Sequence, residues 1–235
     1  MTSWREFWNG AHHIYVSDRH RDVHYRRIAE DICRLVPHGE AVVLDHGCGE
    51  ALHAERVAQA CGRLLLCDAA PSVRERLRAR YADLAEVDVL APEEVEALPD
   101  AGLDLVVASS LVQYLSREEL TVLLALWRRL LRPEGRLVLA DIIPPEAGVL
   151  SDATALLGFA ARERFLGAAV VGLAATFFSP YRRLRRSLGL ARYSEPDMLD
   201  LLRQAGFSAE RLRPNIGFNQ SRMAFSARPM PGAGE

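Results

Sequence analysis

The stretch that decides the fold of this chain is Val43-Leu-Asp45-His-Gly47-Cys-Gly49. The apolar run 41–44 is typical of a buried strand, and residues 50–60 have a helical pattern, so the stretch lies where a strand becomes a helix. Glycines at such a junction let the backbone turn tightly, and they let a ligand approach without a Cβ in the way. The stretch therefore predicts a ligand site at the end of the first strand.

A second carboxylate points to the chemistry of that ligand. Asp68 ends another apolar run, 64–67, and a carboxylate at this place can accept both hydroxyls of a ribose. A dinucleotide fingerprint would need its third glycine at Leu52, and Asp45 would repel the anionic pyrophosphate. S-adenosylmethionine carries a cationic sulfonium and an ammonium group, so the charge of Asp45 favours this methyl donor over a nicotinamide cofactor.

The rest of the chain alternates strand-length apolar runs with helical patterns, as in a parallel sheet with crossover helices. Further strands are predicted at 85–89, 103–108 and 136–140, with helices from Pro71 and over 116–131. The pattern is interrupted at 145–192. It resumes with a helix over 194–205 and a hairpin of strands near 209–213 and 222–227. One or two helices are expected within residues 3–36.

The order of these segments between about Val42 and Ala140 resembles the class I S-adenosylmethionine-dependent methyltransferases, in particular the small-molecule enzymes. Asp45–Gly49 resembles the first motif of that family, and Asp68 resembles its ribose-binding acid. The other three matching segments are Val87–Val89, which would bracket the adenine, Leu103–Tyr114, which would face the cofactor, and Leu130–Leu139, the turn into strand five. Each piece alone is a weak signal, and their order and spacing carry the resemblance.

The resemblance implies S-adenosylmethionine as cofactor, S-adenosylhomocysteine as product, and a set of cofactor-binding positions. These positions are Tyr15, Asp45, His46, Gly47, Cys48, Gly49, Asp68, Ala69, Asp88, Val89, Ser109, Ser110 and Gln113. Many relatives have a third glycine where this chain has Ala51, and we expect alanine to be tolerated there because it is small.

The acceptor side is predicted from residues near the same sheet edge. Methyl transfer is an in-line displacement at an activated carbon, so a catalytic base is not always required. The catalytic candidates are His20, His24, Tyr114 and Asp141. His20 and His24 share a helix face and could act as general base for a hydroxyl acceptor, although each could equally be a surface histidine without function. Their i, i+4 spacing also suits a metal, but no third ligand is evident and no metal site is predicted. Asp141 could instead cap the following turn.

The turn of the final hairpin, Arg213–Ser221, is rich in amides. Asn219 and Gln220 are the substrate-binding candidates, whereas Asn215 and Gly217 are attributed to turn geometry. The residues after the fourth strand, from Ser109, lack the Asn/Asp-Pro-Pro-Tyr/Phe pattern of enzymes that methylate adenine or glutamine amides.

The interruption contains 17 residues without charge, 165–181, which are flanked by arginines. The segment is shorter than the ~20 apolar residues that span a bilayer. One interpretation is a buried helix that acts as an active-site lid or a homodimer contact. The other is a helix in 165–186 that rests on a membrane surface, where the arginines meet anionic head groups and the acceptor is a lipid or isoprenoid. Either interpretation favours a lipophilic or aromatic acceptor, methylated on O, N or C.

Composition sets the remaining expectations. A net charge of −2 gives no electrostatic reason for nucleic-acid binding. The four cysteines form no CxxC pair and the first residues lack the apolar run of a signal peptide, which favours a cytoplasmic protein, with the inner face of the membrane as the alternative. A non-catalytic S-adenosylmethionine-binding module and a nicotinamide-dependent oxidoreductase remain as rival functions.

We expect one α/β domain over residues 1–235, with a Rossmann-like, doubly wound seven-stranded sheet that is mostly parallel and has an antiparallel last strand. Its predicted parts are an N-terminal helical cap (1–40), the cofactor-binding core (41–142) and a helical insertion after strand five (143–193). A C-terminal helix and β-hairpin (194–229) and a flexible tail (230–235) complete it.

Overall fold

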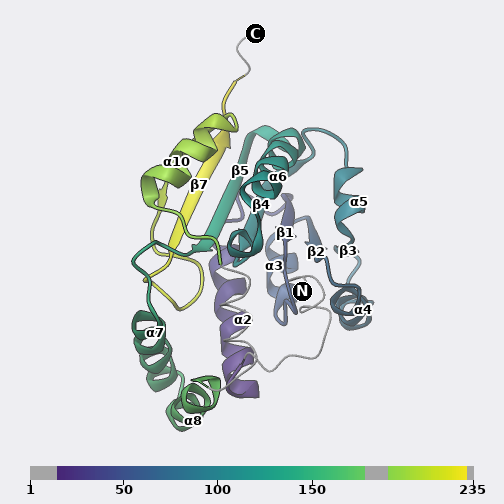
Figure 1. Ribbon diagram of the computed structural model, residues 1–235. Coiled ribbons are helices and arrows are strands. Elements are labelled where there is room, and N and C mark those ends of the chain that lie inside the picture. Colours follow the sequence, from purple (N-terminus) through teal and green to yellow (C-terminus); the bar gives the residue numbers. More distant parts are fainter. Residues whose placement is uncertain (1–14, 178–189, 232–235) are drawn as a thin grey trace.

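The structure, a computed structural model, describes residues 15–177 and 190–231 (Figure 1). Its centre is a seven-stranded sheet with the strand order β3-β2-β1-β4-β5-β7-β6. The five strands from β3 to β5 run parallel, and β7 pairs antiparallel with both β5 and β6. The predicted doubly wound sheet with an antiparallel last strand is therefore confirmed.

The seven strands are β1 Val42–His46, β2 Arg63–Cys67, β3 Val87–Leu90, β4 Leu103–Ser109, β5 Leu131–Ile142, β6 Phe207–Leu212 and β7 Met223–Pro229. The helices are α2 Asp18–Cys33, α3 Ala54–Ala60, α4 Pro71–Arg80, α5 Pro92–Glu96, α6 Arg117–Leu130, α7 Val149–Arg162, α8 Leu166–Phe177 and α10 Glu195–Gln204, with a 3-10 turn, η1, at Val112–Tyr114.

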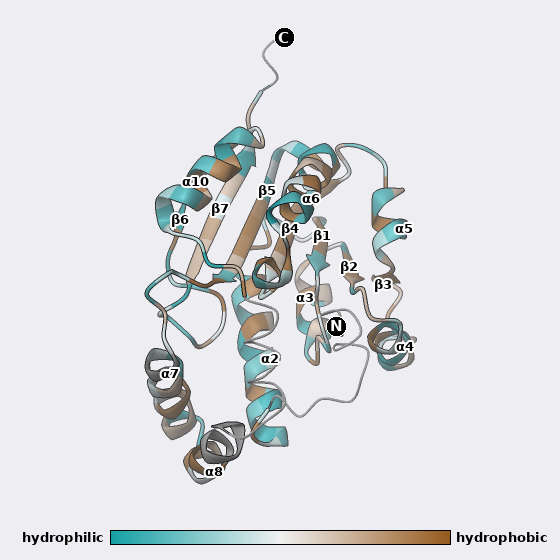
Figure 2. Ribbon diagram, in the orientation of Figure 1, coloured by the Kyte–Doolittle hydropathy of each residue, from teal (hydrophilic) through white to brown (hydrophobic). Residues whose placement is uncertain are grey.

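Both faces of the central strands are buried, which explains why they read as continuous apolar runs. In β1, Val43 packs into the core beneath α2, α3 and α4, whereas its neighbour Leu44 packs into the core beneath α6 and α10. Successive side chains alternate between these two cores because a strand has a period of two. Figure 2 shows strands such as β4 and β5 largely in the hydrophobic colour, and helices such as α6 and α10 with both hydrophilic and hydrophobic faces.

Local signals place the helices that frame the site. Ser116 caps α6 by accepting a hydrogen bond from the Glu119 amide at 3.1 Å, while the Glu119 carboxylate accepts one from the Ser116 amide at 2.8 Å. Ser194 caps α10 in the same manner by accepting from the Asp197 amide at 3.2 Å. Pro71 opens α4, where its missing N–H is no loss.

Several predicted boundaries were wrong. The first crossover helix begins at Ala54 rather than at residue 50, because Gly47, Gly49 and Ala51 all have positive φ, which an α-helix does not admit. Strand β5 covers 131–142 rather than 136–140, since it pairs with β4 on both sides of a register shift. The third strand and both hairpin strands differ from prediction by one or two residues at their ends, and the short helix α5 was not predicted.

The insertion after β5 forms α7 and α8, which lie below the sheet in Figure 1, beside α2. Phe159 of α7 and Phe165 at the turn before α8 pack against Val23 of α2. Arg26 of α2 also bonds the Glu163 carboxylate at 2.9 Å. The arginines predicted to follow the apolar segment, 182–186, lie outside the described residues.

No helix in the part of the chain that the structure describes has the length and apolar character needed to cross a membrane.

Candidate active site

A cavity of about 1490 Å³ opens at the carboxyl ends of the parallel strands. It is bounded on one side by the loops after β1, β2 and β4, and on the other by α2, α7 and the turn of the β6–β7 hairpin. Ligands of open α/β sheets bind at this edge. The strand order therefore brings together the two halves of the site that the sequence predicted separately.

The loop after β1 is built around positive φ angles and the neighbouring strand. The amides of Gly47 and Cys48 both donate to the Cys67 carbonyl, at 2.7 and 3.0 Å. Gly47 has φ +80° and Gly49 has φ +58°, conformations that residues with a Cβ rarely adopt. A Cβ on Gly47 would also lie 3.2 Å from the Leu111 side chain. The two glycines thus let the loop fold back over β2.

Asp68 joins this loop to the start of α4. One of its carboxylate oxygens accepts from the Gly49 amide at 3.0 Å, and the other accepts from the Ala70 amide at 2.8 Å. Arg74 donates to the Asp68 carbonyl at 2.7 Å, which fixes the backbone that carries the carboxylate. Burial raises the pKa of Asp68, and the two amide bonds oppose that rise. The carboxylate is held rigidly at the cavity wall, where the sequence predicted it.

Asp45 lies in the same wall at the end of β1, with only 8% of its surface exposed. Burial raises its pKa to about 7, and the nearby charge of Asp68 adds to the rise. Two buried carboxylates that repel each other bind a cation favourably, because the cation offsets both the desolvation and the repulsion. This electrostatic arrangement fits a cationic ligand and opposes an anionic pyrophosphate.

Tyr25 of α2 completes the loop and was missed by the sequence analysis. Its hydroxyl accepts from the Glu50 amide at 3.1 Å and would lie 2.9 Å from a Cβ on Gly49. Burial raises the pKa of Tyr25 to about 12, so the hydroxyl stays protonated. Nothing in the sequence indicates that this tyrosine reaches the glycine loop, because the two contacting residues are 25 positions apart in the chain.

Other predicted cofactor positions fall into two groups. Those that line the cavity are Tyr15, His46, Cys48, Ala69, Ser109, Ser110 and Gln113. Asp88 and Val89 are not among the described residues that line it, and Asp88 instead pairs with Arg63 at 2.6 Å. His46 accepts a hydrogen bond from Trp127 Nε1 at 3.2 Å, and burial lowers its pKa to about 4. Its ring is therefore neutral at pH 7 and supports the end of β1.

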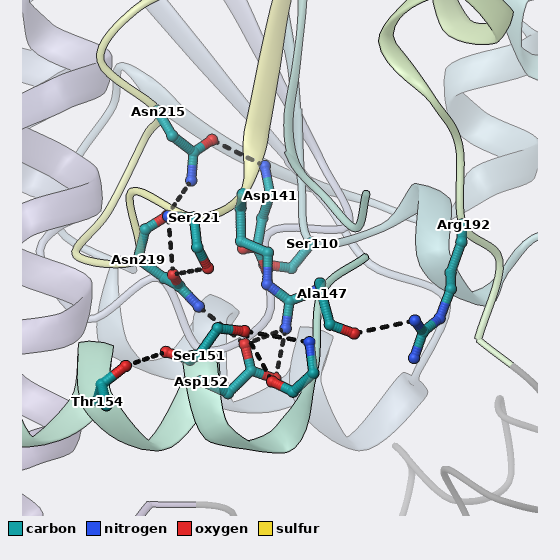
Figure 3. Close-up of polar contacts among 12 residues, drawn as sticks. Ser110, Asp141, Ala147, Ser151, Asp152, Thr154, Arg192, Asn215, Asn219 and Ser221 are labelled. Carbon is teal, nitrogen blue, oxygen red and sulfur yellow. Dashed lines mark hydrogen bonds and ion pairs between the residues drawn. The ribbon is translucent and has the colours of Figure 1, made fainter. Parts of the chain in front are cut away.

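Ser110 and Asp141 face each other across the ends of β4 and β5 (Figure 3). Both have left-handed backbones, with φ of 58° and 59°, and the Ser110 hydroxyl donates to the Asp141 carboxylate at 2.7 Å. A non-glycine residue in this region costs about 1–2 kcal/mol, and such strain concentrates at functional sites. Asp141 and Tyr114, both predicted catalytic candidates, line the cavity. Ser110 lines it as well, so both strained residues are part of its wall.

The two predicted histidines lie in a cluster of aromatic rings rather than on the surface. His20 stacks on Phe165 with ring centroids 5.1 Å apart, and His24 lies 5.9 Å from Phe218. Burial lowers the pKa of His20 to about 4 and that of His24 to about 3, with the neighbouring His20 also contributing to the latter. Both rings are neutral at pH 7, and such low pKa values make them weak general bases. Both rings pack against phenylalanine side chains of the insertion and the hairpin turn.

The hairpin turn meets α7 through a polar network that includes an unpredicted arginine (Figure 3). Asn215 accepts from the Asp141 amide at 3.1 Å and donates to the Asn219 carbonyl at 3.0 Å. Asn219 in turn donates to Asp152 of α7 at 3.1 Å, and Arg222 donates to both oxygens of Asp152, at 2.6 and 2.7 Å. The network ties the end of β5 to the insertion.

This network redistributes the roles predicted for the turn. Asn219 lines the cavity, as expected for a substrate contact. Gln220 is not among the described residues that line it; its side chain accepts from the Asn215 amide at 2.9 Å and donates to the Gly217 carbonyl at 2.9 Å. Gln220 therefore shapes the turn, and Asn215, which is 4% exposed, has the bridging role that turn geometry alone did not suggest.

Among the described residues, no group of three His, Cys, Asp or Glu side chains is arranged to hold a metal ion.

Comparison with known proteins finds a match for the central part of the chain. A family model described as a methyltransferase domain matches residues 43–135, from β1 to the turn within β5. The central part of the chain therefore matches a methyltransferase domain. The resemblance predicted from the glycine loop and the strand order is thereby confirmed.

Individual proteins that resemble this chain agree with this match. An uncharacterised methyltransferase of Mycobacterium tuberculosis is 28% identical over 128 residues, which make up 53% of this chain and 60% of the relative. The chain thus spans less than two thirds of the curated relatives that it matches. The YcgJ protein of Bacillus subtilis has the same fold, with a TM-score of 0.61, 13% identity, and coverage of 88% of this chain and 100% of that one. Magnesium protoporphyrin IX methyltransferase of Synechocystis, solved with bound SAH, has a TM-score of 0.58 and 16% identity, over 96% of this chain and 92% of its own.

Proposed function

We propose that this methyltransferase transfers a methyl group from S-adenosylmethionine to a small, planar aromatic or otherwise lipophilic acceptor. The observation that carries the proposal is the pair of carboxylates formed by buried Asp45 and partly buried Asp68, which lie at the ends of adjacent strands beside a glycine loop. The family match to residues 43–135 supports the same donor.

The residues present fit this cofactor. Asp68, fixed by two backbone amides, would accept the ribose hydroxyls, and Asp45 would offset the positive charge of the donor. The glycine loop gives the backbone close access because Gly47 and Gly49 have no side chain to fill the approach. The bound cofactor would supply an electrophilic methyl group. The chain would orient the acceptor and exclude water from it.

The acceptor half supports an aromatic substrate. His24 and Phe218 line the cavity on the side formed by α2 and the hairpin, and Leu156 of α7 adds apolar surface. Rings that pack edge-to-face or offset against an aromatic substrate contribute about 0.5–1.5 kcal/mol each beyond burial. Asp141, with the Ser110 hydroxyl bonded to it, is the candidate for holding a proton from the acceptor, since it lines the cavity at the strained end of β5.

The test is calorimetric titration of the purified protein with S-adenosylmethionine, with NAD as the competing cofactor. We expect binding of S-adenosylmethionine and none of NAD. Asp68→Ala should weaken binding at least about tenfold, since two hydrogen bonds to a charged group are lost. The matched control is Asp83→Ala, an exposed aspartate outside the cavity lining, which should bind as the wild type does. Preference for NAD, or an equal loss in both variants, would overturn the proposal.

A membrane-surface version is the second candidate, and the exposed apolar face of α8 favours it. Leu166, Val170 and Val171 are 46%, 55% and 71% exposed, while Phe165 and Ala169 of the same segment are buried. An apolar face of this kind can lie at a lipid interface and give access to a lipid or isoprenoid acceptor. Co-sedimentation with anionic liposomes tests it, with Val170→Glu/Val171→Glu as the variant that should lose binding and Val122→Glu, an exposed valine on α6, as control. Equal sedimentation of the variant and its control would exclude this version.

A further inference from the structure

Arg222 is the buried cation on the acceptor side of the cavity. The residue is 6% exposed, and it lines the cavity together with Phe218, Asn219 and Asp152. The other arginines among the described residues of the lining lie on α2 and α4, and they are half-buried or exposed. Its position, one residue before β7, places it at the end of the hairpin turn.

The contacts of Arg222 use only part of its guanidinium. The Nη2 atom donates to both oxygens of Asp152. Nη1 and Nε are buried and have no hydrogen-bond partner among the described residues. A guanidinium offers five N–H donors, of which three belong to Nη1 and Nε. Buried donors without partners are costly, and a ligand that accepts from them would recover that cost.

A structural tie alone does not require this arrangement. The hairpin is already joined to α7 by the hydrogen bond from Asn219 to Asp152 at 3.1 Å, and to α2 by the bond from the Gly217 amide to Asp31 at 2.9 Å. Asp152 has 24% of its side chain exposed, so solvent reaches the acid more readily than it reaches Arg222, whose side chain is 7% exposed. The more buried partner of the pair is therefore the cation, which lines the cavity while its Nε and Nη1 atoms lie beneath the cavity surface.

We propose that Arg222 binds a carboxylate of the methyl acceptor, so that the substrate is a planar aromatic acid. This inference rests on the proposed methyl transfer and names the substrate class for the same cavity. The aromatic side chains around Phe218 would pack against the ring, and Arg222 would donate hydrogen bonds to its carboxylate as a charge-assisted pair, which is about twice as strong as a neutral hydrogen bond. Asp152 holds the guanidinium in place, and its negative charge limits the affinity for the acid.

The experiment measures binding to protein saturated with S-adenosylhomocysteine. The probes are three acids, each paired with its neutral amide of the same shape: 4-hydroxybenzoate, salicylate and 3-(4-hydroxyphenyl)propanoate. We expect at least one acid to bind about tenfold more tightly than its amide, which is the difference that one charge-assisted bond supplies. Arg222→Gln should bring the binding of that acid down to the level of the amide.

Two further variants separate recognition from a structural role. Asp152→Asn keeps the guanidinium and removes the opposing charge, so the acid should bind more tightly than to the wild type, with the amide unchanged. The double variant Asp152→Asn/Arg222→Gln leaves no unpaired charge in the fold and should lose the preference for the acid. If Arg222 were only a strut, Asp152→Asn and Arg222→Gln would weaken the acid and the amide alike.

The outcomes distinguish the two proposals. Binding of S-adenosylhomocysteine is measured first, in the wild type and in every variant. If the wild-type protein does not bind it, the proposed methyl-transfer function is refuted. If S-adenosylhomocysteine binds but none of the three acids is preferred over its amide, the role of Arg222 is refuted while the function stands.

Discussion

The raised pKa of Asp45 makes cofactor affinity depend on pH near neutrality. Burial and the charge of Asp68 raise this pKa to about 7, so half of the ligand-free molecules are protonated there at pH 7. A cationic ligand binds the ionised carboxylate, so protein that is protonated must first lose the proton. Affinity for S-adenosylmethionine should therefore fall as the pH falls, by about tenfold for each unit well below pH 7.

The magnitude follows from the ionised fraction. At pH 8 about nine tenths of Asp45 is ionised, and at pH 6 about one tenth, so the dissociation constant should rise about tenfold between these values and about another tenfold by pH 5. The stability of the ligand-free protein should change in the opposite sense. The folded pKa lies above the usual pKa of an aspartate, so the stability associated with protonated Asp45 is present at low pH and is lost as the pH rises through 7.

The assay is calorimetric titration with S-adenosylmethionine between pH 5 and 8, in phosphate and in Tris. Two buffers with different ionisation enthalpies report proton release, which we expect to approach one proton per ligand at pH 6. Asp45→Asn should bind more weakly at pH 8 and show little pH dependence. His46→Gln is the control, because the pKa of His46 lies near 4 and the slope between pH 6 and 8 should survive. A flat affinity profile in the wild type, or an unchanged slope in Asp45→Asn, would refute the reasoning.

Two further predictions concern the loop and the insertion. Ala51 and Ala54 are both buried, but Ala51 has φ +39° whereas Ala54 lies in α3. Ala51→Gly should therefore lower the free energy of unfolding, measured in urea, by about 1–2 kcal/mol less than Ala54→Gly does. Equal losses in the two variants would show that the loop is unstrained. Glu163→Gln removes the ion pair with Arg26, in which the side chains of Glu163 and Arg26 are 30% and 37% exposed. Because solvent screens such a pair, the free energy of unfolding should change by less than about 1 kcal/mol, while limited proteolysis between α7 and α8 should become faster. Unchanged proteolysis would mean that this contact does not hold the insertion against α2.

The cofactor half of the site could be predicted from sequence because its geometry is local. The Gly47–Gly49 loop and Asp68 lie at the ends of two strands that pair in parallel, and strand ends of a parallel sheet meet at one edge whatever the loops do. The glycines report positive φ directly, which is why they are informative in a single sequence. The helix start at Ala54 was misjudged for the same reason, since Ala51 adopts positive φ without being a glycine.

The acceptor half could not be predicted because its contacts join distant parts of the chain. Arg222 meets Asp152 across 70 residues, and Asn215 meets the Asp141 amide across 74. One arginine among 29 basic residues carries no signal of burial until the hairpin and the insertion are placed together. The amide-rich turn was visible, but which amide faces the cavity depended on the turn conformation, and Gln220 folded inward onto the Gly217 carbonyl.

The two halves differ in how their positions are fixed, and this suggests how the site works. The two carboxylates proposed to bind the cofactor, Asp45 and Asp68, lie at the ends of β1 and β2, whose backbones are hydrogen-bonded to each other in the sheet. The acceptor residues are held by a chain of side-chain bonds from the Asp141 amide through Asn215 and Asn219 to Asp152. Asp141 itself is strained, so the interactions that keep it in place must offset about 1–2 kcal/mol. A ligand that accepts from Arg222 would strengthen the far end of this chain. We infer that binding of the acceptor stabilises the Asp141–Ser110 pair, which couples substrate recognition by Arg222 at the hairpin turn to the geometry at the strand ends.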